Sequence, residues 1–103
     1  MYRVDWETPI MCAALRSPHG VDTPLVFDNA EVSRALLGEG PEPVEVAAQM
    51  SQALVNFAHT GDPSQEGLAW PRYELPDRQT LIFDVPGKVV SDPDRERREF
   101  WTA

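Results

Sequence analysis

Cysteine is nearly absent from this chain, and it contains no long apolar run. The single cysteine, Cys12, cannot form an internal disulfide or by itself build a thiolate zinc site. No apolar stretch approaches the ~20 residues that span a bilayer, and the first residues do not resemble a signal peptide. We therefore expect a protein of a reducing compartment, the cytoplasm, with no membrane partner.

Basic residues are also scarce. Nine Lys and Arg stand against seventeen Asp and Glu, which gives a net charge of -8. Such a balance repels phosphate backbones, so we expect no nucleic-acid partner. A hydrophobic content of 42% over 103 residues is typical of a globular chain and leaves room for one domain at most.

The clearest predicted element is a helix between Pro43 and Gly61. Gly61 supplies its C-terminal stop, and Pro63 prevents continuation. Most of its residues are apolar or small, so we expect most of its circumference to be covered. The exception is one narrow polar stripe, formed by Glu45, Gln49, Gln52, Asn56 and His59.

The other predicted elements are short. Alternation over Tyr2–Trp6 and the apolar run Thr80–Phe83 predict two strands. A brief helix is expected to start with Asp28 as N-cap and to close at Gly38, and a tail helix is expected to have Pro93 at its first position. Two strands form at best a marginal sheet, and two long irregular segments remain. These observations indicate part of a larger fold.

Motifs of self-contained sites are missing. The chain has no G-x-S-x-G elbow, phosphate-binding loop, H-E-x-x-H helix or dinucleotide fingerprint. Its histidines and cysteine do not support a metal site, and we expect no cofactor. His59 lies on the polar stripe near a helix end, where we expect an ordinary surface residue.

His19 is the candidate functional residue, because it lies in the loop after the first predicted strand. Loops held by a rigid sheet often carry catalytic side chains. Pro18 fixes one torsion before the imidazole, and Gly20 allows a sharp turn after it. From these facts alone, an ordinary loop residue is favoured over a functional role for His19.

Together with the strand before it, this loop resembles the last catalytic strand and histidine loop of type-B carboxylesterases, which include para-nitrobenzyl-esterase-like enzymes and cholinesterases. The resemblance covers nearly the whole chain in the right order. The residues that carry it are 2–6 (YRVDW), 17–29 (SPHGVDTPLVFDN), 56–63 (NFAHTGDP), 70–73 (WPRY), 81–84 (LIFD) and 89–97 (VVSDPDRER).

The resemblance implies an α/β class and the C-terminal portion of an α/β-hydrolase fold. Residues 1–103 would form the last sheet strands plus the C-terminal helices of a catalytic domain, incomplete on their own. Such enzymes hydrolyse carboxylic esters with a triad in the chain order Ser, acid, His. His19 matches the catalytic histidine, so the serine, the acid and the oxyanion hole are expected upstream of Met1.

The same resemblance implies that this chain is inactive alone. Its partners would be the missing N-terminal part of the domain or another copy of the chain, with a small-molecule ester as substrate of the complete enzyme. Asp22 is read as a loop-ordering carboxylate rather than the triad acid, and Ser17 and Ser33 lack the context of a nucleophile. Met11 and Cys12 could border a substrate pocket, although packing against the loop is favoured.

Several aromatic and charged residues have expected structural roles. Arg95, Arg97 and Arg98 form a mixed-sign helix surface with neighbouring acids, where single ion pairs contribute little. The residues expected to fasten the irregular stretches to a body supplied elsewhere are Trp70, Tyr73, Phe83 and Trp101.

Two other functions stay open at this point. A non-catalytic, cholinesterase-like binding module would share the same motifs but lack a working serine elsewhere in its domain. An autonomous small α+β domain would form a stable, cooperative monomer without any further chain.

Overall fold

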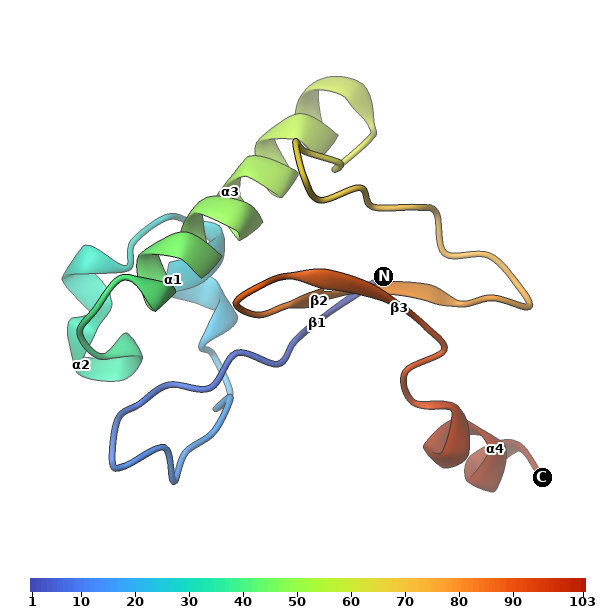
Figure 1. Ribbon diagram of the computed structural model, residues 1–103, viewed down its shortest axis with the longest axis horizontal. Helices are drawn as coiled ribbons and strands as arrows, with labels where there is room; N and C mark the ends of the chain where they lie inside the picture. Colours follow the sequence, from blue (N-terminus) through green and yellow to red (C-terminus); the bar gives the residue numbers. More distant parts are fainter.

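The computed structural model describes residues 1–103, in which a small mixed sheet lies beneath one long helix (Figure 1). The strands are β1 (Tyr2–Val4), β2 (Gln79–Phe83) and β3 (Lys88–Ser91), in the order β1-β2-β3. β1 runs parallel to β2, with Tyr2 opposite Leu81, and β2 runs antiparallel to β3. Two predicted strands are thus confirmed in β1 and β2, whereas β3 was not predicted.

The long helix α3 (Glu42–Thr60) confirms the strongest prediction of the sequence. Gly61 ends it in the left-handed conformation, with φ of 77°, and donates its amide to the carbonyl of Phe57 at 2.8 Å. One face of α3 is buried through Val46, Met50 and Ala53. The positions i, i+4 and i+7 share one side of a helix, which explains why this face is continuous.

Between β1 and α3 the chain forms three short elements, α1 (Asp22–Val26), a 3-10 turn (Glu31–Ser33) and α2 (Arg34–Leu37). The predicted start of this region was wrong, because Asp28 has a φ of 54° and caps no helix. Its predicted end at Gly38 is confirmed. A Cβ at Gly38 would lie 2.6 Å from the Cγ of Pro9, so only glycine lets these two segments approach each other.

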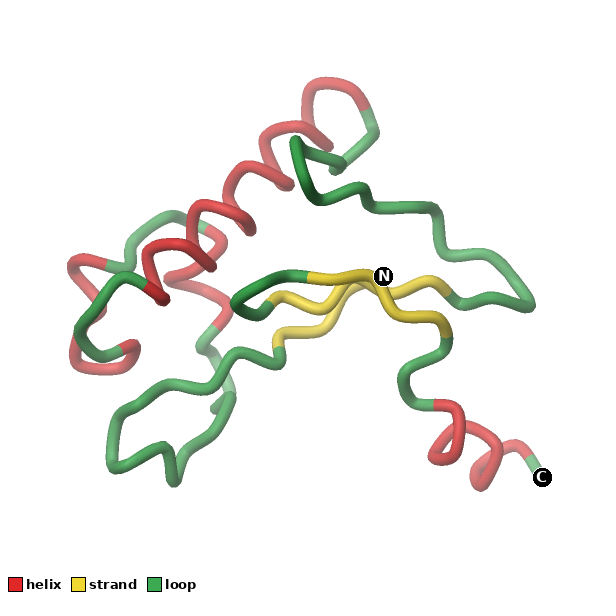
Figure 2. Tube along the Cα trace, in the orientation of Figure 1, coloured by secondary structure: helices red, strands yellow, loops and turns green.

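The tail helix α4 (Arg95–Thr102) is the last element, and it lies apart from the long helix at the far end of the sheet (Figures 1 and 2). It begins after Asp94, so the prediction of Pro93 at its first position was wrong. No residue of α4 is buried. None of the helices is long and apolar enough to cross a membrane.

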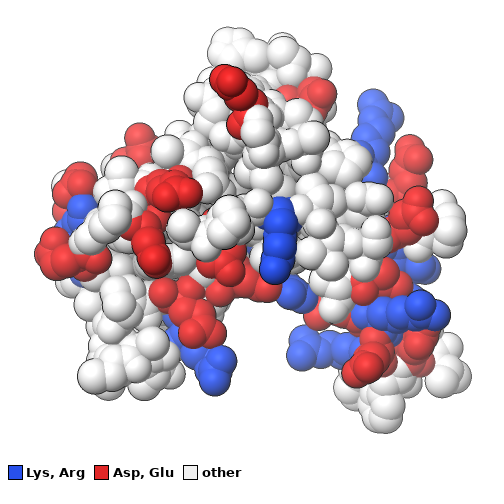
Figure 3. Space-filling model, in the orientation of Figure 1, with Lys and Arg blue, Asp and Glu red and all other residues white.

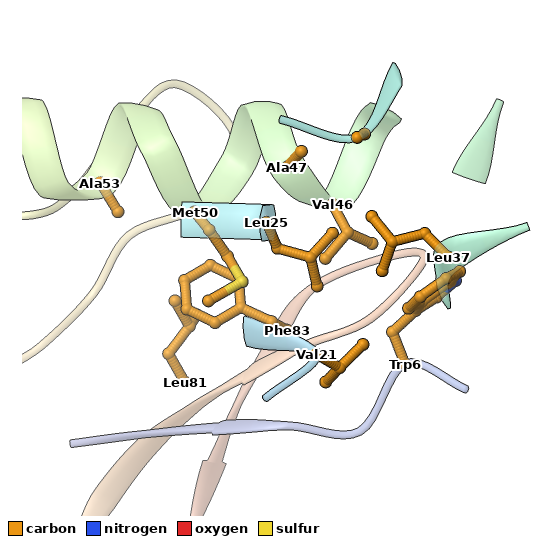
Figure 4. Close-up of a cluster of buried hydrophobic side chains, with 11 residues drawn as sticks. Trp6, Val21, Leu25, Leu37, Val46, Ala47, Met50, Ala53, Leu81 and Phe83 are labelled. Atoms are coloured by element: carbon orange, nitrogen blue, oxygen red, sulfur yellow. The ribbon is translucent and has the colours of Figure 1, made fainter. Parts of the chain in front are cut away.

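The core lies where α3, α1 and the sheet meet, and Figure 4 shows its side chains pointing toward one another. Trp6 closes one end of it and donates its indole N–H to the carboxylate of Glu42 at 3.2 Å. The core is small, since only 16 of the 103 residues are buried. Its members are Trp6, Val21, Leu25, Ala30, Leu37, Val46, Ala47, Met50, Ala53, Leu81 and Phe83.

The molecule is flat, with extents of 41 × 35 × 19 Å. Its radius of gyration is 14.6 Å, against about 13 Å for a typical domain of this length. The accessible surface is 6949 Å², whereas a monomer of 11.6 kDa exposes roughly 5,800 Å². About 1,100 Å² of surface is therefore in excess of what a self-contained domain of this mass exposes.

Candidate functional site

His19 lies at the second position of a tight turn formed by residues 18–21. The amide of Val21 donates to the carbonyl of Pro18 at 3.2 Å, and Gly20 has a φ of 81°. A positive φ at the third residue is the mark of a type II turn, which explains why glycine follows the histidine. The turn leaves the His19 side chain exposed.

Both ends of this turn are fixed to the rest of the molecule. On one side, the hydroxyl of Ser17 donates to the carbonyl of Val4 in β1 at 3.1 Å. On the other side, Val21 is buried and Leu25 of α1 is completely covered by the core. The backbone of His19 is thus held in a defined place relative to the sheet.

No side chain of this chain is paired with the imidazole. His19 makes no hydrogen bond or ion pair, and the carboxylate of Asp22 makes none either. Asp22 lies in the first turn of α1, where a negative charge is favourable, and the predicted loop-ordering role gains no further support. No group of three or more His, Cys, Asp or Glu side chains comes together as a metal site.

The loop before the histidine contains a left-handed turn that the sequence did not indicate. Met11, Cys12 and Ala13 have φ values of 55°, 55° and 61°, a region that L residues other than glycine seldom adopt. The expected packing of Met11 and Cys12 against the loop was wrong, because Met11 is 69% exposed and Cys12 is exposed as well. A hydrogen bond from the amide of Thr8 to the carbonyl of Arg16, 2.9 Å long, closes this loop.

A large open groove lies elsewhere, along the C-terminal half of α3. Its volume is about 980 Å³, and His19 is not among its lining residues. The groove runs between α3, the start of β1 and the segment 61–73. Leu54 and Phe57 line it and are 46% and 57% exposed. The surplus of apolar residues on the predicted helix was the signal for it.

Aromatic rings pack edge-to-face beside this groove. Phe83 lies 5.7 Å from both Tyr2 and Trp70, measured between ring centroids. Trp70 and Phe83 thus pack within this chain, whereas Tyr73 and Trp101 are exposed, Trp101 by 77%. The predicted anchoring to a body outside this chain stays a prediction.

Part of the polar stripe of α3 is covered by other residues rather than exposed to solvent. Asn56 donates its side-chain amide to the carbonyl of Ser64 at 2.7 Å, and Gln65 donates to the backbone carbonyl of Gln49 at 2.9 Å. Both stripe residues are half-buried as a result. The stripe therefore ties the segment after α3 to the helix, while His59 is exposed as expected.

Ion pairs fasten α4 to the sheet. Arg98 donates two hydrogen bonds to Asp92, at 2.5 and 3.2 Å, and Arg78 lies 3.9 Å from the same carboxylate. Arg98 holds the pKa of Asp92 below its ordinary value, and the charges of Arg78 and Arg95 act in the same direction. The side chains of this ion-pair group are half-buried, at one end of the mixed-sign surface that the sequence predicted.

A second ion-pair group joins β1 to the start of α4. Arg3 donates to both carboxylate oxygens of Asp5, at 2.6 and 2.8 Å, and to Asp94 at 2.9 Å. These hydrogen bonds raise the pKa of the Arg3 guanidinium, which stays charged. Figure 3 shows acidic and basic side chains along both sides of the molecule in this view, and some of both signs in its middle.

Comparison with known proteins gives one consistent family. The model of the carboxylesterase family matches residues 1–101. The para-nitrobenzyl esterase of Bacillus subtilis (strain 168) is 34% identical over 101 residues, which cover 96% of this chain and 20% of that protein. Carboxylesterase 5A of Canis lupus familiaris is 28% identical over 112 residues, which cover 99% of this chain and 19% of that protein.

Solved structures of the same family share the fold. A PNB esterase structure superposes with a TM-score of 0.80 at 30% identity, covering 96% of this chain and 20% of that one. A carboxylesterase structure from Geobacillus stearothermophilus superposes with a TM-score of 0.79 at 31% identity. The match covers 98% of this chain and 21% of that one. The chain spans about a fifth of the length of these relatives, which are α/β-hydrolases. The protein described by this sequence belongs to the carboxylesterase family and has the fold of one part of its α/β-hydrolase domain.

Proposed function

We propose that residues 1–103 form the C-terminal part of a carboxylesterase catalytic domain and supply its general base, His19. The observation that carries this proposal is the position of the imidazole. It is exposed on a turn fixed to β1, and no side chain of this chain is paired with it. A catalytic histidine needs a fixed backbone and a free face toward the reacting groups.

In the proposed reaction, the neutral imidazole accepts the proton of a serine hydroxyl as the serine oxygen attacks the ester carbonyl. The imidazolium then gives this proton to the leaving alcohol, which departs and leaves an acyl-enzyme. A water molecule then attacks the acyl-enzyme while the imidazole takes its proton. The imidazolium returns this proton to the serine oxygen, and the carboxylic acid is released. An imidazole suits both tasks because it changes its charge near neutral pH.

The serine, the triad acid and the oxyanion hole belong, in this proposal, to the remainder of the catalytic domain. Ser17 is an unsuitable nucleophile, because its hydroxyl donates a hydrogen bond to the carbonyl of Val4 in β1. Ser33 ends a 3-10 turn without the strand-turn-helix context of a nucleophile elbow. The chain alone is therefore expected to hydrolyse no ester.

The test uses a chimera in which residues 1–101 replace the matched segment of the Bacillus subtilis para-nitrobenzyl esterase. We expect His19→Ala to lower kcat for a p-nitrophenyl ester by at least ~1,000-fold, because the loss of one triad member disables the whole unit. His59→Ala is the matched control, since His59 is exposed on α3 away from the turn, and its rate should be unchanged.

Two results would contradict this function. One is a chimera whose rate survives His19→Ala. The other is an isolated chain that hydrolyses the ester faster than buffer and loses that rate with the same substitution.

A further inference from the structure

We propose that residues 11–15 (MCAAL), an exposed turn in the loop before His19, bind the alkyl chain of the ester substrate. We name this segment the apolar tip. It would make the complete enzyme prefer esters with a long alkyl chain over short ones. This inference rests on the proposed function, because it takes the reacting ester from the proposed reaction of His19.

All five residues of the apolar tip are exposed to solvent, and none of them is charged. Met11 is 69% exposed and Leu15 is 40% exposed. The charged surface resumes directly after the tip, where Arg16 pairs with Glu7 at 3.2 Å. Runs of consecutive exposed apolar residues are unfavourable in a folded protein unless a function requires them.

The backbone of the apolar tip is ordered by hydrogen bonds. The amide of Ala14 donates to the carbonyl of Met11 at 3.2 Å, and the amide of Arg16 donates to the carbonyl of Ala13 at 3.1 Å. The first three residues of the tip have left-handed torsions, although none of them is glycine. Such torsions cost free energy and cluster at ligand-binding and catalytic segments.

The base of the same loop is fixed to the rest of the molecule. Thr8 is fully buried, and its hydroxyl donates to the carbonyl of Leu36 at 2.7 Å. Pro9 lies against Gly38, where a Cβ would come within 2.6 Å of the proline Cγ. Figure 1 shows the loop, in blue, extending from this base away from the long helix. The tip is therefore exposed on a well-anchored loop.

The apolar tip and His19 belong to one structural unit. The Thr8–Arg16 hydrogen bond closes the loop, and the hydrogen bond from Ser17 to β1 follows it directly and anchors the histidine turn. Leu15 is four residues before His19, so their Cα atoms are at most ~14 Å apart. An ester with its carbonyl at the imidazole can extend a long alkyl chain to the tip, whereas an acetyl methyl group ends beside the imidazole.

An alkyl chain is the ligand that the chemistry of the tip fits. Apart from the thiol of Cys12, a weak donor, its side chains offer no group for a charged or hydrogen-bonding substituent. Each methylene group that leaves water against Met11 or Leu15 contributes favourable free energy. Methionine also adapts its shape to different apolar neighbours. Such a chain can belong to the acyl or to the alcohol part of the ester.

The experiment compares chain lengths in the chimera of residues 1–101 with the Bacillus subtilis para-nitrobenzyl esterase, below the solubility limit of each ester. We expect Met11→Ser and Leu15→Ser each to lower the kcat/KM ratio of p-nitrophenyl octanoate to p-nitrophenyl acetate by at least about tenfold, because they remove apolar contacts with the longer chain. Octyl acetate against ethyl acetate tests the alcohol part in the same way. The series that responds identifies the part of the ester that the tip binds.

Two variants serve as controls for these ratios. Met11→Leu should preserve the ratio, because it keeps an apolar side chain of similar size. Val32→Ser should also preserve it, since Val32 is 84% exposed but lies on the 3-10 turn outside the loop.

Cys12 gives a second measurement that needs no turnover and therefore also decides the case of an inactive chimera. Its thiol is exposed and should react readily with iodoacetamide in the chimera. Octanol or octanoate should slow this alkylation several-fold, whereas ethanol and acetate should not. Mass spectrometry of the peptide that contains Cys12 follows the reaction.

Three results would overturn the proposal. One is a pair of serine variants that leave both ratios unchanged. Another is a Cys12 thiol that is unreactive in the chimera without any ligand, because the tip would then be packed against the rest of the domain. The third is an effect that appears only above the solubility limit of the octanoate ester, because the tip would then contact an aggregate surface.

His19→Ala separates this inference from the proposed function. A chimera that loses its rate with His19→Ala but keeps both ratios in Met11→Ser and Leu15→Ser supports the function and overturns the role of the apolar tip. A chimera whose rate survives His19→Ala, while the octanoate ratio falls in the serine variants, contradicts the function and supports alkyl-chain binding by the tip.

Discussion

Single residues around His19 differ in how well they suit their backbone torsions. Gly20 has a φ of 81° at a position where a Cβ would meet no atom within 4 Å. Ala13 has a φ of 61° in the left-handed turn of the same loop. Glycine is therefore required at position 20 by torsion alone, and alanine at position 13 is strained for the same reason.

Exchanging these residue types should have opposite effects. Gly20→Ala should destabilise the turn by about 1 kcal/mol, and Ala13→Gly should stabilise its own turn by a similar amount. Amide hydrogen exchange reports the stability of each of the two turns separately. The Val21 amide, bonded to Pro18, should exchange several-fold faster, and the Arg16 amide, bonded to Ala13, several-fold slower. Changes of the same sign at both sites would contradict this assignment.

Only part of this detail could be predicted from the sequence. Pro18 and Gly20 around His19 predicted a sharp turn, because both residues have known torsional preferences. The left-handed torsions of Met11, Cys12 and Ala13 could not be predicted, because their residue types disfavour them. They lie in a loop that the Thr8–Arg16 hydrogen bond closes, and such a closure is not visible in residue propensities.

Among the elements, α4 depends on charge rather than on burial. It contributes no residue to the core. It is held beside the sheet by the ion pair of Arg98 with Asp92, the residue after β3, and by that of Arg3 in β1 with Asp94, the residue before α4. The aromatic pair Phe100 and Trp101 stack edge-to-face with centroids 5.2 Å apart, yet both are exposed. The docking of α4 should therefore respond to pH.

The direction of this pH effect follows from the lowered pKa of Asp92. Since the folded state favours the charged carboxylate, docking is fully stabilised above the ordinary value of 3.8 and is lost as pH falls through the lower, folded-state pKa. Heteronuclear NOE values of the α4 amides should show an ordered helix at pH 6 and a mobile one well below pH 3.8.

A substitution separates this ion pair from general acid effects. Arg98→Met should make α4 mobile already at pH 6, because it removes both hydrogen bonds to Asp92. Arg95→Met should not, since Arg95 pairs with Glu99 on the same helix. An Arg98→Met protein with an ordered α4 at pH 6 would show that other contacts hold the helix.

Sequence pattern predicted the long element well and the short ones poorly. The polar stripe, the apolar remainder and Gly61 together located α3, because nineteen residues give several turns of periodicity. α1 and β3, with five and four residues, are too short to show a period. The covering of Gln49 and Asn56, two of the five stripe residues, also escaped prediction, because it depends on how the following segment folds back.

On the scale of the whole molecule, the sequence predicted incompleteness but not its location. A surplus of apolar residues on the long helix, few strands and long irregular segments indicated that more chain is needed. The structure shows an exposed apolar groove at Leu54 and Phe57, and the segment 61–73 forms its second wall. That wall has no regular secondary structure from which its path could be predicted.

Calorimetry of the isolated chain tests most directly the claim that residues 1–103 are part of a larger packed domain. A self-contained domain of about 100 residues unfolds in one sharp transition with an enthalpy of about 60–80 kcal/mol. For this chain we predict a broad transition of much smaller enthalpy. A sharp transition of the full enthalpy from a monomeric chain would contradict the account.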